Sequence, residues 1–152
     1  MTAESIGYMF QNPDYTLFEN TVSDEVKFGA KNVGLKENEA EKGAQQRLKE
    51  FGLTAFKDKD PDNLSIGQKR RVNIVSLLLM KPEIIILDEP DTGLDRINSV
   101  QLMELLCLAN QKGLTVIIIS HNLKLIKNLC NRIIFIDKGE IVGANPYLEL
   151  SK

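Results

Sequence analysis

The sequence predicts an α/β protein with a mostly parallel sheet and a small helical subdomain. Residues 84–87 and 116–119 are runs of aliphatic, mainly β-branched residues, too short for buried helices, and they indicate buried strands. Between and before them lie longer segments with apolar residues at three- and four-residue spacing, which indicates helices. Strands that alternate with helices are typical of a parallel α/β sheet.

The first third of the chain is predicted to hold one strand and then mostly helix. Residues 6–10 form a short strand. It ends before Asn12-Pro13-Asp14, because these residue types favour a turn. Residues 22–62 are more polar and mostly helical, and Thr21 or Ser23 begins the first helix.

Two further helices are predicted before the second strand. One covers about residues 37–51 and ends at Gly52. Its apolar residues at helical spacing are Ala40, Ala44, Leu48 and Phe51. The other runs from about residue 65 to residue 80, where Lys81-Pro82 ends it.

The remaining elements alternate as an α/β sheet requires. In chain order we expect a strand over 84–87, a helix over 96–111, a strand over 116–119, a helix over 122–130, a strand over 133–136 and a hairpin turn over 137–140.

Composition limits the classes of function. The chain has 152 residues, enough for one domain, or for one domain with a small lobe. Its 19 basic and 21 acidic side chains give a net charge of -2, so bulk charge gives no reason to expect nucleic-acid binding. No apolar run approaches the ~18 residues of a membrane helix, and no signal peptide follows Met1. We therefore expect a cytoplasmic chain that reaches a membrane only through a partner.

Polar residues follow three of the predicted strands. In parallel α/β sheets, ligands bind at the carboxyl ends of the strands. Gln11 follows the first strand, Asp88 and Glu89 follow the second, and His121 follows the third. Asp88 could hold Mg²⁺ directly or through water, and Glu89 could accept a proton from an attacking water. Solvated acids at a strand end and a structural histidine are the alternatives.

A glycine-containing segment, Leu64-Ser65-Ile66-Gly67-Gln68, precedes a predicted helix. Ser65 and Gln68 fit a capping box, so local structure alone could explain them. The same geometry presents free N–H groups and a hydroxyl to phosphate, and Gly67 lets the backbone approach closely. Both interpretations stay open at this point.

Together these motifs resemble those of the ATP-binding-cassette (ABC) family. Gln11 stands at the Q-loop, and Leu64 to Gln68 resembles the signature, with Ile66 where glycine is usual. Leu87-Asp88-Glu89-Pro90 resembles Walker B, Gly93-Leu94-Asp95 the D-loop, and Ser120-His121 the H-loop. Residues 10–14, with Leu17-Phe18, Thr21-Val22 and residues 26–29, are similar to ATPases of energy-coupling-factor and cobalt importers.

The resemblance implies part of a P-loop NTPase core. Residues 12–75 would form the helical subdomain with the Q-loop and the signature helix, and residues 76–152 the α/β core. The implied cofactors are ATP and Mg²⁺, with Asp88 and Gln11 at the metal and Glu89 and His121 catalytic. The nucleotide-binding residues would be Gln11, Leu64, Ser65, Gly67, Gln68 and Asp95. The implied partners are a second ABC ATPase subunit and a transmembrane subunit, with the ATPase at the inner face of the membrane.

The family's phosphate-binding Walker A loop does not occur in these 152 residues, which contain no Gly-Lys-Ser or Gly-Lys-Thr. A truncated gene, a fragment and a degenerate paralogue are the alternatives. We expect the chain to be inactive alone, and strand 84–87 to lack a neighbour on one side. Importer ATPase is the first functional interpretation, and a binding subunit that completes a paralogue's site is the second. The compact helical lobe without heptads argues against a DNA-repair ATPase.

Overall fold

The computed structural model describes residues 5–123, 126–127 and 130–146. The chain forms two compact units, Met1–Ile119 and Ser120–Lys152. Within the described residues, no helix has both the length and the apolar character needed to cross a membrane.

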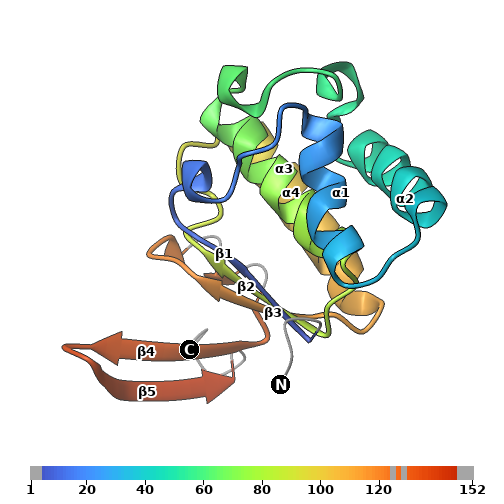
Figure 1. The fold of residues 1–152 in the computed structure, drawn as a ribbon. Helices are drawn as coiled ribbons and strands as arrows, with labels where there is room; N and C mark the ends of the chain where they lie inside the picture. Colours follow the sequence, from blue (N-terminus) through green and yellow to red (C-terminus); the bar gives the residue numbers. More distant parts are fainter. Residues whose placement is uncertain (1–4, 124–125, 128–129, 147–152) are drawn as a thin grey trace. The chain divides into compact units, whose positions relative to one another are not determined.

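A three-stranded parallel sheet organises the first unit (Figure 1). Its strands are β1 (Ile6–Met9), β2 (Ile84–Asp88) and β3 (Thr115–Ile119), in the order β1-β2-β3. The predicted strands and their parallel arrangement are confirmed. The expectation that β2 lacks a neighbour is wrong, because β2 pairs with β1 on one side and with β3 on the other.

The helices follow the predicted pattern closely. After η1 (Pro13–Tyr15), α1 (Val22–Asn32) begins at the N-cap Thr21, whose side chain accepts from the amide of Asp24. Then follow α2 (Glu37–Glu50), η2 (Thr54–Phe56), η3 (Pro61–Asn63), α3 (Ile66–Leu79) and, after β2, α4 (Arg96–Gln111). In Figure 1 the four α-helices lie on one side of the sheet, as right-handed crossovers between parallel neighbours require.

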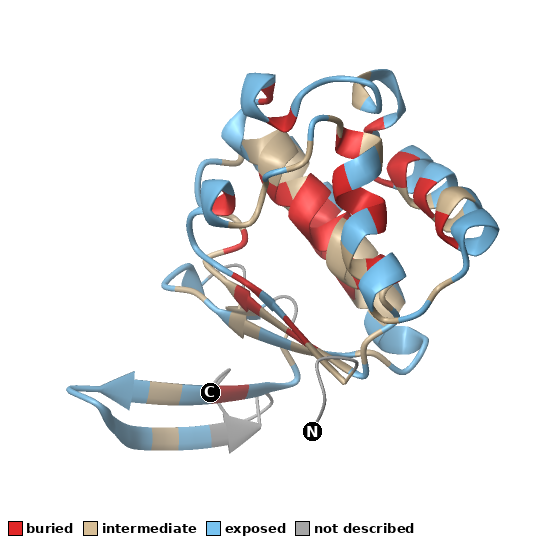
Figure 2. Ribbon diagram, in the orientation of Figure 1, coloured by how far each residue is buried: buried red, intermediate tan, exposed pale blue. Residues whose placement is uncertain are grey.

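The buried residues lie between that face of the sheet and α3, and also where α1 and α2 pack on α3 (Figure 2). Met9, Ile85 and Leu87 are buried on this face. Gly7 also faces α3, and a Cβ added to it would lie only 3.1 Å from the Cδ2 atom of Leu77. The prediction that β3 is buried is wrong. Alternate residues of the strand face away from the core, and Ile117 and Ile119 are 46% and 49% exposed.

The second unit contains a two-stranded antiparallel sheet of β4 (Arg132–Asp137) and β5 (Glu140–Pro146). The predicted hairpin turn is confirmed: Lys138 and Gly139 both have positive φ, at 48° and 83°, as a two-residue turn between twisted strands requires. β4 therefore pairs with the following strand instead of adding to the parallel sheet. The predicted helix over 122–130 includes 124–125 and 128–129, which lie outside the described residues.

Candidate functional site

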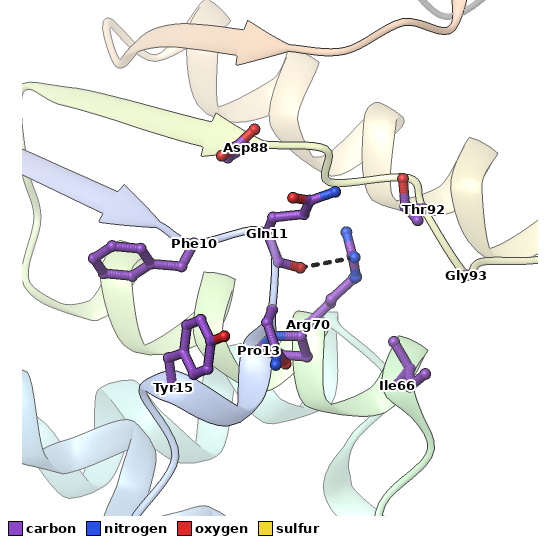
Figure 3. Close-up of a pocket in the computed structure, with 10 residues that line it drawn as sticks. Phe10, Gln11, Pro13, Tyr15, Ile66, Arg70, Asp88, Thr92 and Gly93 are labelled. Carbon is purple, nitrogen blue, oxygen red and sulfur yellow. Dashed lines mark hydrogen bonds between the residues drawn. The ribbon is translucent and has the colours of Figure 1, made fainter.

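A pocket of about 410 Å³ lies in the first unit, beyond the carboxyl ends of β1 and β2 (Figure 3). The lining residues come from both strand ends, the start of η1, α3 and the loop after β2: Phe10, Gln11, Asn12, Pro13, Tyr15, Ile66, Arg70, Asp88, Thr92 and Gly93. Two predicted site residues, Gln11 and Asp88, thus line one pocket at the sheet edge where ligands bind in this class of fold.

Asp88 is the last residue of β2, and the adjacent strand β1 carries Tyr8, which pairs with Ile86, two residues before Asp88. The Tyr8 hydroxyl donates to Asp88 Oδ2 at 3.4 Å. Desolvation first, and then the charge of Asp88, raise the pKa of Tyr8 above its ordinary value. Tyr8 therefore stays a neutral donor at physiological pH and holds the Asp88 carboxylate at the strand end.

Glu89 follows directly and has an unusual backbone. Its φ is 48°, in the left-handed region that non-glycine residues seldom occupy. Its amide donates to the carbonyl of Ile119 at 2.9 Å, and the Thr92 hydroxyl donates to its Oε2 at 3.1 Å. Glu89 lies next to Asp88 but is absent from the residues that line the pocket.

Arg70 is the residue of the site that sequence reasoning missed. It lies in α3, is 3% exposed, and lines the pocket. Its Nη2 donates to the carbonyl of Gln11 at 2.9 Å, and its Nη1 donates to the carbonyl of Glu89 (Figure 3 shows the first bond). Burial lowers the pKa of its guanidinium, and the negative charges of Asp91, Glu89 and Asp88 act in the opposite direction. Arginine remains protonated in proteins, so the side chain is a cation here. The signal in the sequence was the basic run Lys69-Arg70-Arg71, which lies in a helix that also buries apolar residues.

The glycine-containing segment forms the start of α3, and the capping interpretation is confirmed. Ser65 is the N-cap: its Oγ accepts from the amide of Gln68 at 3.3 Å, and Gln68 Oε1 accepts from the amide of Ser65 at 2.9 Å. Leu64 is buried, so it anchors the segment. Ser65 and Gln68 do not line the pocket.

The two central residues of this segment touch the loop after β2. Ile66 is 56% exposed and lies against Gly93. A Cβ added to Gly93 would lie 3.3 Å from the Cγ2 atom of Ile66. A Cβ on Gly67 would meet Leu94 Cδ2 at 2.6 Å. The start of α3 and the loop over 93–94 are therefore packed together, and small residues make this packing possible.

The other two predicted site residues lie outside the pocket. Asp95 is the N-cap of α4 and accepts from the amide of Asn98 at 2.8 Å and from its side chain at 2.6 Å. These bonds, led by the backbone one, lower the pKa of Asp95. His121 is exposed and belongs to the second unit, so the structure gives its position only within that unit.

The donor set suits Mg²⁺ better than a metal that needs a complete protein cage. Among the described residues, no three His, Cys, Asp or Glu side chains gather closely enough to hold a metal by themselves. Asp88 and Gln11 nevertheless present a carboxylate and an amide oxygen in one open pocket. Mg²⁺ is commonly held by one or two such groups together with waters and substrate phosphates.

Comparison with known proteins identifies the family of the chain. The family model described as "ABC transporter" matches residues 1–92, more than half of the chain. The chain belongs to the ABC transporter family. It is 42% identical, over 94% of its length, to the energy-coupling factor transporter ATP-binding protein EcfA of Methanococcus maripaludis, covering 52% of that protein. It is 41% identical, over 91% of its length, to EcfA of Methanocaldococcus jannaschii, covering 50%. The chain thus spans about half the length of these curated relatives.

Solved structures show the same fold. The chain matches cbiO1 from Clostridium perfringens, described as part of the ABC transporter complex cbiONQ, with a TM-score of 0.85 and 38% identity. That match covers 97% of this chain and 59% of the other. A second ATP-binding cassette, a dimer in a post-hydrolysis state with ADP and Pi, matches with a TM-score of 0.85 and 28% identity over 94% of this chain and 63% of the other. The predicted fold class, part of a P-loop NTPase core of the ABC type with a helical subdomain, is confirmed.

Proposed function

We propose that this chain carries the Q-loop, signature, Walker B and D-loop functions of an ATP-binding and ATP-hydrolysing subunit of an ABC importer of the energy-coupling-factor type. The observation that carries the proposal is the meeting of Gln11 and Asp88 in one pocket at the carboxyl ends of adjacent parallel strands. The family match and the resemblance to two EcfA proteins support it.

In this proposal the residues around the pocket divide the work. Asp88 and Gln11 would hold Mg²⁺, which neutralises charge on the nucleotide phosphates. Glu89 would accept the proton of an attacking water, with Thr92 fixing its carboxylate through the 3.1 Å hydrogen bond. His121 would contact the terminal phosphate, and Asp95 would communicate across a dimer.

The start of α3 would act on a nucleotide held by a second ATPase subunit. The capping box uses the Ser65 hydroxyl and the Gln68 amide, but a helix N-terminus has further N–H groups that attract phosphate. Leu64 anchors the segment, and Gly67 lets the backbone approach. A transmembrane subunit would complete the importer, with the ATPase at the inner face of the membrane.

A second candidate function is a subunit that binds a paralogue and completes its ATP site through the signature alone. The observation that favours it is local: the start of α3 has its own N-cap, Ser65, and packs against the loop over 93–94 within these residues. The paralogue's Walker A would supply the N–H cradle and the lysine for the β- and γ-phosphates. This chain would contribute the start of α3 to that nucleotide site.

ATP-driven association tests both candidates. The chain is mixed with a full-length paralogue whose catalytic glutamate is replaced by Gln, and complex formation is followed by sedimentation with ATP–Mg²⁺, with ADP and without nucleotide. We expect association with ATP only, lost in Ser65→Arg. Two results would reject a role of the signature in nucleotide binding. One is association that is equal with and without nucleotide, and the other is ATP-dependent association that Ser65→Arg does not reduce.

A further inference from the structure

One buried side chain joins the ends of two strands to α3. Arg70 Nη2 donates to the carbonyl of Gln11, the second residue after β1, and its Nη1 donates to the carbonyl of Glu89, the first residue after β2. The side chain is almost fully buried, so the two carbonyls take the place of water at Nη1 and Nη2, while Nε is buried without a hydrogen-bond partner among the described residues. A guanidinium can serve two carbonyls at once because its donors form a rigid fork.

The backbone of Glu89 depends on such support. Its left-handed φ of 48° is unfavourable for a residue with a Cβ and persists only where the surroundings impose it. The amide is bonded to Ile119 and the carbonyl to Arg70, so both sides of the residue are fixed. The position of the Glu89 carboxylate follows from this backbone.

The segment after β1 is held by the same helix. Besides Arg70, Asn73 donates to the carbonyl of Pro13 at 3.2 Å, and Lys69 forms an ion pair with Asp14 at 2.7 Å. Three residues of α3 within two turns therefore fix residues 11–14. A displacement of α3 carries this segment with it, and Arg70 is the residue that extends the connection to Glu89.

We propose that Arg70 is a positioning residue that couples the placement of α3 and of residues 11–14 to the backbone of Glu89. The inference rests on the proposed function only where it concerns catalysis by Glu89; the mechanical coupling is independent of it. A lysine could reach one carbonyl with its compact ammonium group but could not bridge both. The coupling therefore requires arginine and not merely a positive charge.

Amide hydrogen exchange on the 152-residue chain tests the coupling. The reporters are hydrogen-bonded amides in both segments. Tyr15 and Thr16 donate to the carbonyls of Asn12 and Pro13, and Glu89 and Thr92 donate to the carbonyls of Ile119 and Glu89. Arg70→Met and Arg70→Lys are compared with Arg71→Met, which removes a neighbouring arginine that donates to the carbonyl of Phe51 instead. We expect Arg70→Met to speed exchange about tenfold or more at both loops, and Arg71→Met to change neither.

A double-mutant cycle separates coupling from local loosening. Asn73→Ala perturbs residues 11–14 without touching Glu89, and we expect it to speed exchange at Glu89 and Thr92 when Arg70 is present. In the Arg70→Lys background this transmitted effect should vanish. Equal transmission in both backgrounds, or an effect of Arg70→Lys on neither loop, would overturn the proposal. If Arg70→Met fails to fold, the lysine variant decides.

Activity provides a separate test. In a complex that hydrolyses ATP, Arg70→Lys should lower kcat about tenfold or more and leave KM for ATP within about twofold, because the group acts on Glu89 and not on bound nucleotide. An unchanged kcat, or a loss confined to KM, would refute the catalytic part. If exchange shows the coupling but the wild-type complex has no turnover, the proposed function fails and the coupling by Arg70 stands.

Discussion

Ser65 and Gln68 bond each other's backbone at the start of α3, with the Ser65 amide donating to Gln68 Oε1 at 2.9 Å and the Gln68 amide donating to Ser65 Oγ at 3.3 Å. The serine of the signature is therefore also the N-cap that begins α3. Capping and nucleotide binding can be separated, because aspartate caps a helix as well as serine does but carries a charge that repels phosphate.

Substitution of Ser65 should affect stability according to capping alone. We expect Ser65→Ala to lower the free energy of unfolding by about 1 kcal/mol and Ser65→Asp to leave it nearly unchanged. Chemical denaturation followed by circular dichroism measures both. Equal losses in the two variants would show that the hydroxyl does more than cap the helix in the free chain.

The contact between Gly67 and Leu94 predicts non-additive effects. Alanine has a better helix propensity than glycine, by up to about 1 kcal/mol, but its Cβ would meet Leu94 Cδ2 at 2.6 Å. Gly67→Ala should therefore stabilise the chain clearly more in a Leu94→Ala background than in the wild type. The free energies of unfolding of the four proteins give the coupling. Additive changes would mean that this contact is not formed.

Acid should weaken the ion pairs around Lys27. This buried lysine contacts Glu41 at 2.9 Å and Asp24 at 3.2 Å. Hydrogen bonds lower the pKa of both carboxylates. For Glu41 the largest cause is the hydrogen bond from Lys27. For Asp24 the largest cause is the hydrogen bond from Thr21, and the bond from Lys27 comes second. Depressed folded-state pKa values contribute stability above the unfolded-state pKa, and this stability is lost as pH falls through the folded-state values.

Lys27→Met should therefore make the loss of stability below about pH 5 shallower. The change should be small, because the two carboxylates are partly exposed and solvent screens them. Arg47→Met, which removes a partner of the exposed Glu50, is the control and should leave the profile unchanged. Denaturation midpoints across the acidic range measure the effect, and parallel profiles for wild type and Lys27→Met would contradict the assignment.

The exposed face of β3 should promote self-association. Ile117 and Ile119 lie on it, and exposed apolar strands pair readily with other copies. We expect concentration-dependent association that Ile117→Lys reduces, while Gln101→Lys, which adds the same charge on α4, does not. Light scattering over a concentration series tests this. A wild-type chain that stays monomeric throughout would contradict it.

Local signals were sufficient to predict most elements. Turn residues at Asn12-Pro13-Asp14, the N-cap Thr21 and the capping box at Ser65 are determined by nearby residues, and the structure has each of them. The burial of β3 could not be predicted in this way. An aliphatic run such as 116–119 has the same local pattern whether one or both faces of the strand are covered, because coverage depends on what packs against the strand.

The candidate site was predicted only in part for a similar reason. Gln11 and Asp88 lie at the ends of strands, so the rule that ligands bind at the carboxyl ends of parallel strands predicted that they share one site, and both line the pocket. Arg70 lies in the middle of a helix, 19 residues before one of its partners and 59 after the other. No spacing rule predicts that one side chain bonds two such distant carbonyls.

Rescue of ATP hydrolysis in trans tests the proposed role of the signature most directly. A full-length paralogue with a disabled signature is mixed with this chain as wild type, as Ser65→Ala and as Ser65→Asp, and phosphate release is measured. We predict rescue by wild type and none by Ser65→Asp, even though this variant keeps its cap and its fold. A charge-assisted bond worth roughly 1.5–3 kcal/mol places Ser65→Ala about ten- to a hundredfold below wild type. Equal rescue by wild type and Ser65→Asp, or no rescue by a wild-type chain that co-purifies with the paralogue, would contradict the proposed role of the signature.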